Sequence, residues 1–121
     1  MRALAHYRPV EKPRLEDIWP GVAADLRTGL LALDKGDLAS QIDDLRIEAT
    51  CGCGARFCQS IHTVPLSDDP YPEPSYTIEV GSIEIDVAGG NICYIEIMDR
   101  EDLEASFAEL ANIVGDDAEA T

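Results

Sequence analysis

Residues 76–97 carry the pattern that most narrowly limits how this chain can fold. Apolar and polar residues alternate through this stretch, which is typical of strands with one buried face. The pair Gly81-Ser82 interrupts the alternation, and a two-residue turn with glycine first favours a type II′ hairpin. Such a turn fixes the register of the strands beside it. The pairs are then Val80 with Ile83 and Ile78 with Ile85, all of them apolar.

A second turn follows at residues 88–90, and it allows two registers. A two-residue loop of Gly89-Gly90 places Ile85 opposite Tyr94, whereas a three-residue loop places Ile85 opposite Cys93. We prefer the three-residue loop, because it keeps one face of the sheet apolar and the other acidic. The solvent face is then expected to carry Glu84, Asp86 and Glu96.

Helical patterns lie on either side of these strands. Pro20 suits a first helical position, and the apolar residues after it have helical spacing. Gly36 is expected to end this helix, and Asp37 to cap a second, short helix. A final helix is expected to be capped by Asp99 and to end at Gly115. The two apolar stripes are Val22, Leu26, Leu30 and Leu33, and Leu103, Phe107, Leu110 and Val114.

Two further strands are expected over residues 45–51 and 57–64, followed by a proline-rich connection over 65–75. These elements predict an α+β fold with N-terminal helices, a five-stranded, mostly antiparallel sheet and a C-terminal helix. The expected organisation is a loose N-terminal arm (1–14), a single domain (15–115) and a frayed acidic tail (116–121).

The densest group of reactive side chains lies between the first two strands, over residues 51–58, a segment that we call the knuckle. Its sequence is Cys-Gly-Cys-Gly-Ala-Arg-Phe-Cys. Together with the histidine four positions further on, it offers three sulfurs and one nitrogen, which are ligand types that zinc takes. Zinc is therefore the candidate cofactor. The candidate ligands are Cys51, Cys53, Cys58 and His62.

The spacing of the cysteines also fits other roles. Zinc sites usually have two residues between paired cysteines, and the spacers here are one and four residues long. A tight turn explains the glycines without any ligand. A redox role, or a disulfide between Cys51 and Cys58, is a third interpretation, which a reducing compartment disfavours. The sequence leaves all three interpretations open.

Charge is the second strong signal. The formal net charge is −15, and it is unevenly distributed. Residues 1–60 hold eight Lys and Arg against nine Asp and Glu, whereas residues 61–121 hold one against fifteen. Such a field repels nucleic acid and anionic membranes and attracts basic proteins. An acidic surface also serves solubility alone.

Motifs of catalysis and of export are missing from the sequence. There is no phosphate loop, dinucleotide fingerprint, metalloprotease motif or calcium loop. Cys58 and His62 share a strand face but lack a third, orienting group, so we do not expect an enzyme. No long apolar run and no secretory signal is present, and the expected compartment is the cytoplasm.

Residues 38–47, the Cys-Gly-Cys-Gly segment with Cys58, and the Ile-Glu-Ile-Met-Asp segment at 95–99 resemble a group of small uncharacterised bacterial proteins. Members of this group share a short helical leader, a Cys-x-Cys-Gly knuckle and a closing Ile-Glu-Ile-x-Asp strand. The likeness spans residues 22–110. It implies a compact cytoplasmic α+β domain, and it implies no activity and no role for any residue.

Two functions follow from these observations. We first expect a small acidic protein-binding module, similar to an immunity protein or an antitoxin, that inhibits a basic partner. The alternative is a zinc- or redox-responsive domain built on the knuckle and His62. Edge strands of the sheet also allow two copies to pair as a homodimer. The expected partner-binding residues are Glu79, Glu84, Asp86, Glu96, Asp99, Glu101 and Asp102.

Overall fold

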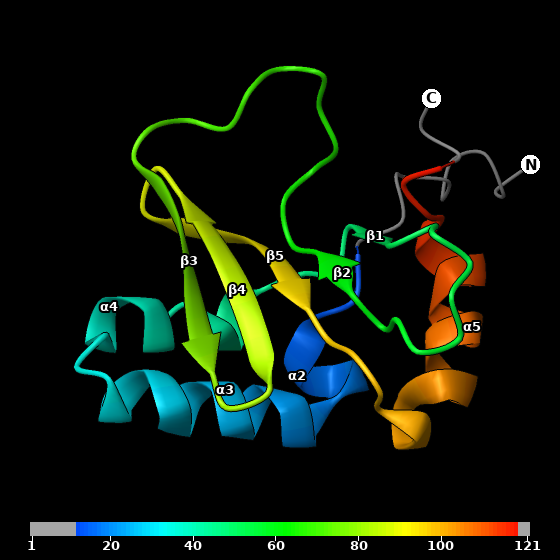
Figure 1. Cartoon of the computed structure of the whole chain (residues 1–121), viewed down its shortest axis with the longest axis horizontal. Coiled ribbons are helices and arrows are strands. Elements are labelled where there is room, and N and C mark those ends of the chain that lie inside the picture. Colours follow the sequence, from blue (N-terminus) through cyan, green and yellow to red (C-terminus); the bar gives the residue numbers. More distant parts are fainter. Residues whose placement is uncertain (1–11, 119–121) are drawn as a thin grey trace, which may run out of the picture.

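The computed structural model describes residues 12–118, so most of the expected arm over 1–14 lies outside the described residues (Figure 1). The fold is α+β, as predicted, with N-terminal helices, a five-stranded antiparallel sheet and a C-terminal helix. The elements are α2 (Leu15–Ile18), α3 (Pro20–Ala32), α4 (Gly36–Ala39), η1 (Ile42–Asp44), β1 (Ala49–Thr50), β2 (Ile61–His62), β3 (Ser75–Val80), β4 (Ile83–Ala88), β5 (Asn91–Glu96), η2 (Glu101–Leu103) and α5 (Glu104–Val114).

The sheet has the strand order β1-β2-β5-β4-β3, and all neighbouring strands are antiparallel. Helices α2 and α3 lie along one side of the sheet, and α5 stands beside β1 at its far end (Figure 1). The long connection between β2 and β3 contains no helix or strand, as its prolines predict. Within residues 12–118, no helix combines the length and the apolar character needed to cross a lipid bilayer.

The β3–β4 hairpin has the predicted register. Val80 pairs with Ile83, and Ile78 pairs with Ile85. Gly81 has a φ of 64°, a left-handed conformation that favours glycine at the first position of this turn. The turn chemistry and the apolar pattern therefore specify the same pairing.

The predicted β4–β5 register is wrong, because the loop has two residues instead of three and the pairing shifts by one residue further along the strands. Gly89 and Gly90 both have positive φ and form a two-residue turn, so Ala88 pairs with Asn91. The register then shifts between Asp86 and Val87, and Ile85 pairs with Ile95. This irregularity takes up one extra residue of β5, which lets both Ile92 and Ile95 enter the core.

Two predicted helix boundaries near the N-terminus are also wrong. Helix α3 ends at Ala32, and Asp34, not Gly36, has the left-handed conformation after it, with a φ of 60°. Leu33 lies beyond the helix and is exposed, although the rest of its predicted stripe is buried. Asp37 lies inside α4 and makes no side-chain capping hydrogen bond.

The C-terminal helix begins later than predicted. Asp99 has a φ of 59° and does not cap the helix, because the 3₁₀ turn η2 comes before α5. Gly115 ends α5 with a φ of 79°, as predicted. The predicted stripe faces the core: Leu103 and Leu110 are buried, and Phe107 and Val114 pack against them at its margin.

The strands on either side of the knuckle are shorter than predicted. Only Ala49–Thr50 and Ile61–His62 pair as strands. The residues beyond them bond to other segments instead, since the amide of Ile47 donates to Pro13 and the amide of Gln59 donates to Ile97. The knuckle is therefore attached to the sheet by its two ends.

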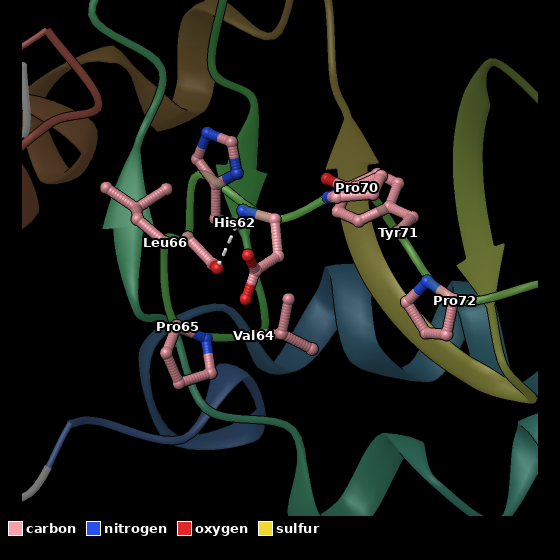
Figure 2. Close-up of a pocket in the computed structure, with 9 residues that line it drawn as sticks. His62, Val64, Pro65, Leu66, Pro70, Tyr71 and Pro72 are labelled. Atoms are coloured by element: carbon pink, nitrogen blue, oxygen red, sulfur yellow. Dashed lines mark hydrogen bonds between the residues drawn. The ribbon is translucent and has the colours of Figure 1, made fainter.

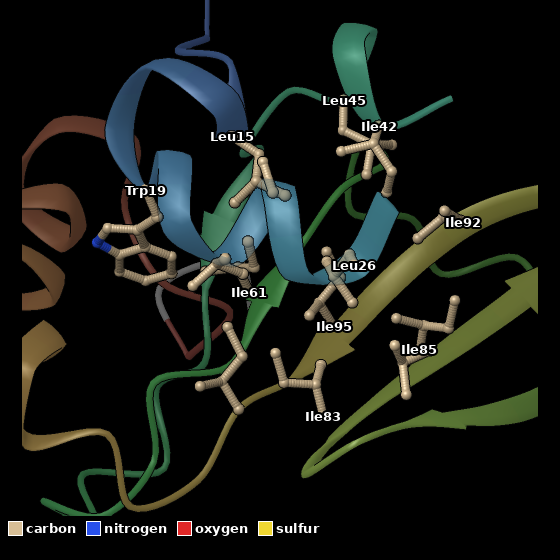
Figure 3. Packing of buried hydrophobic residues seen from close by; sticks show 14 of the residues in the cluster. Leu15, Trp19, Leu26, Ile42, Leu45, Ile61, Ile83, Ile85, Ile92 and Ile95 are labelled. Atoms are coloured by element: carbon tan, nitrogen blue, oxygen red, sulfur yellow. The ribbon is translucent and has the colours of Figure 1, made fainter. Parts of the chain in front are cut away.

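One hydrophobic core joins the helices to the inner side of the sheet (Figure 3). Leu26 of α3 lies next to Ile95 of β5 in this view. Trp19 joins the two helical groups, because its ring stacks on Phe107 with centroids 6.4 Å apart and its Nε1 donates to the Ser106 hydroxyl at 2.8 Å. This packing sets the position of α5 beside the knuckle.

Replacing Leu26 with alanine is expected to lower the free energy of unfolding by about 2–5 kcal/mol, because it leaves a cavity in the core. Leu31→Ala is the matched control on the same helix, since Leu31 is 59 % exposed and Leu26 is 0 % exposed. Urea denaturation followed by circular dichroism measures both. Equal losses for the two variants would contradict this packing.

Candidate metal centre

The three cysteines of the knuckle converge. The Sγ atoms of Cys51, Cys53 and Cys58 all lie within 4.8 Å of one another. All three thiols are free; Cys58 is buried, Cys51 half-buried and Cys53 exposed. The chain reverses between them at Gly54, which has a φ of 79°. Three sulfurs thus lie close enough together to bind one metal ion.

Buried polar side chains hold the second half of the knuckle in place. Ser60 is fully buried, and its hydroxyl accepts the amide of Ile97 at 3.0 Å while lying 3.4 Å from the Cys58 sulfur. Gln59 is also buried, and its side chain bonds to the carbonyl of Arg56 and to the amide of Arg100. These contacts satisfy the backbone of a segment that leaves the regular sheet.

The local environment shifts the pKa values of Cys51 and Cys53 in opposite directions. Burial raises the pKa of Cys51 to about 11. The Ala55 amide and the thiols of Cys58 and Cys51 hydrogen-bond to Cys53 and lower its pKa. Tyr94 lies behind the group, and burial strongly raises the pKa of its phenol. Cys53 is therefore both more accessible and more easily ionised than Cys51.

His62 is not one of the grouped ligands, although the sequence made it a candidate. Its Nε2 atom lies 2.9 Å from Oδ2 of Asp117, and its ring lies 4.8 Å from the ring of Tyr94. His62 pairs across the sheet with Ala49 and Tyr94. From this position its side chain contacts Asp117 in the C-terminal segment instead of the thiols.

Asp117 is a structural residue of the site that the sequence did not reveal. Its Oδ1 accepts the amide of Gly52 at 2.7 Å, and its own amide donates to Thr50. A side chain at position 52 would lie 2.9 Å from the Cβ of Ala118, so this close approach requires glycine. The sequence predicts a frayed tail over 116–121. In the structure, Asp116 and Asp117 pair with Thr50 of β1. Residues 119–121 lie outside the described part.

Four of the acidic candidates lie on strands β3 to β5, and three lie on the segment after β5. Glu79, Glu84 and Glu96 form a row, since Glu84 pairs across the sheet with both of the others. A hydrogen bond with Glu96, which needs a proton on one of the two groups, raises the pKa of Glu84, and the repulsion between the two charges raises it further. Asp86 lies two residues along β4 from Glu84, on the same face of the sheet, and accepts the hydroxyl of Thr77. Asp102 pairs with Arg100 at 2.9 Å. Asp99 and Glu101 are exposed on the segment after β5.

Among the hollows of the described part of the chain, one lies beside His62 and another beside the cysteines. A pocket of about 630 Å³ lies under the proline-rich connection, with the side chains of His62 and Tyr71 on its wall (Figure 2). A smaller hollow of about 240 Å³ lies between the knuckle and α5. Cys51, Cys58 and Arg56 line it from the knuckle, and Glu104 lines it from the helix.

Comparison of this chain with protein-family models, with curated proteins and with solved structures gives no match. The interpretation of the site therefore depends on its own geometry.

Replacing Asp117 with alanine is expected to destabilise the fold by about 1–2 kcal/mol, because the Gly52 amide and His62 lose a charged acceptor. Burial alone would raise the pKa of Asp117, but its bonds with His62 and Gly52 lower it overall. The effect of Asp117→Ala should therefore be present at neutral pH and shrink as the pH falls through this lowered pKa. Urea denaturation over a pH series measures it, with Asp102→Ala as the exposed control. Equal effects would contradict a supporting role for Asp117.

Proposed function

We propose that this protein binds a thiophilic metal ion, with Zn²⁺ as the first candidate, through the thiolates of Cys51, Cys53 and Cys58. The convergence of the three sulfurs within 4.8 Å carries this proposal. Tetrahedral zinc, with bonds of about 2.3 Å to sulfur, needs sulfurs about 3.8 Å apart. The sulfurs thus need to close by up to about 1 Å.

The flexibility required for this closure lies at Cys53. It is exposed and lies between two glycines, whereas Cys58 is buried and anchored. A small movement of Cys53 toward the other two sulfurs would complete the ligand set without disturbing the core. A metal ion also employs all three thiols, whereas a single disulfide would leave one unpaired.

Three protein ligands leave one zinc position for a ligand that is not part of this group. Closed structural zinc sites have four protein ligands, whereas open sites keep a position for water or another small ligand. His62, bonded to Asp117, is not placed to be the fourth ligand. The proposal is therefore an open, three-thiolate site, which could respond to metal supply or to oxidation of its thiols.

Protein purified without a histidine tag under reducing conditions is expected to contain one zinc per chain by elemental analysis. Cys53→Ser and Cys58→Ser should each abolish stoichiometric binding, because two thiolates hold zinc weakly. Cys93→Ser is the matched control, since Cys93 is a free, buried thiol outside the group. His62→Ala should also keep its zinc. Fully reduced protein that takes up neither Zn²⁺ nor Cu⁺ would contradict the proposal.

A second candidate function is the binding of a basic protein by the acidic half of the chain, as an immunity protein or antitoxin would. The row of Glu79, Glu84 and Glu96 favours it. Like charges directly opposite on neighbouring strands destabilise a sheet. A row of three therefore has a cost in stability, and the positive side chains of a partner would remove the repulsion.

Replacing Glu96 with glutamine is expected to stabilise the free protein at neutral pH, because it removes the repulsion from Glu84. Because the pKa of Glu84 is raised in the folded protein, the folded protein holds the Glu84 proton more tightly than the unfolded chain does. The destabilisation is thus absent at low pH and develops as the pH rises through that pKa, so the variant should gain nothing in acid. Urea denaturation at several pH values tests this. The control is Glu109→Gln, since Glu109 is an exposed residue of α5.

The same variant tests binding. A lysine-rich peptide should bind the wild-type chain with an affinity that falls steeply with salt, and Glu96→Gln should weaken it more than Glu109→Gln does. Equal weakening by the two variants would indicate only a general effect of net charge and would contradict the row as a binding surface.

A further inference from the structure

We propose that the metal ion of the knuckle is an exchangeable cargo, which leaves when the thiolate of a small molecule displaces Cys53 from it. This inference rests on the proposed metal-binding function. It concerns the direction of metal release and the chemical class of the acceptor.

The three ligands differ in how firmly they are held. Cys58 is 4 % exposed, and its backbone forms an isolated β-bridge with Met98. Its sulfur lies against the buried hydroxyl of Ser60. The amide of Cys51 donates to the carbonyl of Ser60 at 2.9 Å. Both ends of the knuckle thus bond to Ser60, the buried residue just before β2, and the Cys58 sulfur is also enclosed by packing.

Cys53 lies in different surroundings. It is exposed, and a side chain at the neighbouring Gly54 would meet no atom within 4 Å. Among the three ligands, Cys53 can therefore move away from the metal with the smallest change in packing.

An incoming ligand has an approach to the metal on the other side of the group. The hollow of about 240 Å³ is lined by the remaining two ligands, Cys51 and Cys58. Helix α5 forms its opposite wall through Glu104, Phe107 and Ala111. This small, half-open hollow suits a small thiol better than a folded protein. An open fourth position lets such a thiol bind before Cys53 leaves.

The exchange balances without an oxidant or a reductant. A bond forms between the metal and the incoming sulfur, and the bond between the metal and the Cys53 sulfur breaks. The proton lost by the incoming thiol is taken up by the Cys53 thiolate, and the metal keeps its oxidation state. Repetition at Cys51 and Cys58 completes the release.

The rate law of zinc transfer tests this mechanism. The zinc-loaded full chain is mixed with a chromogenic chelator and increasing concentrations of 2-mercaptoethanol, and transfer is followed by absorbance. A tenfold rise in thiol should raise the rate about tenfold, since the thiolate takes part in the slow step. Ethylene glycol, in which a hydroxyl replaces the thiol, is the matched control and should have no effect.

The order of alkylation of the zinc-loaded chain identifies the leaving ligand. Limited iodoacetamide followed by peptide mass spectrometry should find Cys53 modified first and Cys58 last. A rate independent of thiol, or first modification of Cys51 or Cys58, would overturn this inference while the metal site stands. A chain that binds neither Zn²⁺ nor Cu⁺ would overturn the proposed function and this inference with it.

Discussion

The burial of the α3 leucines against the isoleucines of β4 and β5 is the interaction on which the rest of the molecule depends. Leu26 and Leu30 are fully buried, and so are Ile85 and Ile95 on the central strands. This contact orients the sheet, and the stack of Trp19 on Phe107 then fixes α5 relative to the same core. The knuckle lies between β1 and β2, next to this helix, so the position of its thiols derives from apolar packing elsewhere.

The knuckle itself is held by a different kind of interaction. Buried hydrogen bonds of Gln59 and Ser60 replace the regular ladder where the chain leaves the sheet. No buried side-chain nitrogen or oxygen in the described part of the chain lacks a partner. Such a network holds the ends of the knuckle in one arrangement, whereas Cys53, in its middle, is exposed. The difference between anchored Cys58 and exposed Cys53 follows from it.

The sequence predicts best those features that depend on residues close to one another in the chain. The β3–β4 register follows from Gly81, because turn geometry and apolar pairing involve neighbouring residues. The grouping of three thiols likewise follows from their proximity in sequence. The β4–β5 register was missed because its irregularity depends on how Ile92 and Ile95 fit the core. The partner of His62 was missed because Asp117 lies 55 residues away, and no local pattern marks that contact.

The contact between Asp117 and Gly52 has a consequence for how the protein is made. Gly52 precedes Asp117 by 65 residues, so the thiols leave the ribosome well before Asp117 does. Until Asp117 emerges, the backbone between Cys51 and Cys53 lacks the carboxylate that receives the Gly52 amide. The cysteine loop thus acquires this support late in synthesis, and a chain cut before Asp117 would carry the same three thiols on an unsupported turn.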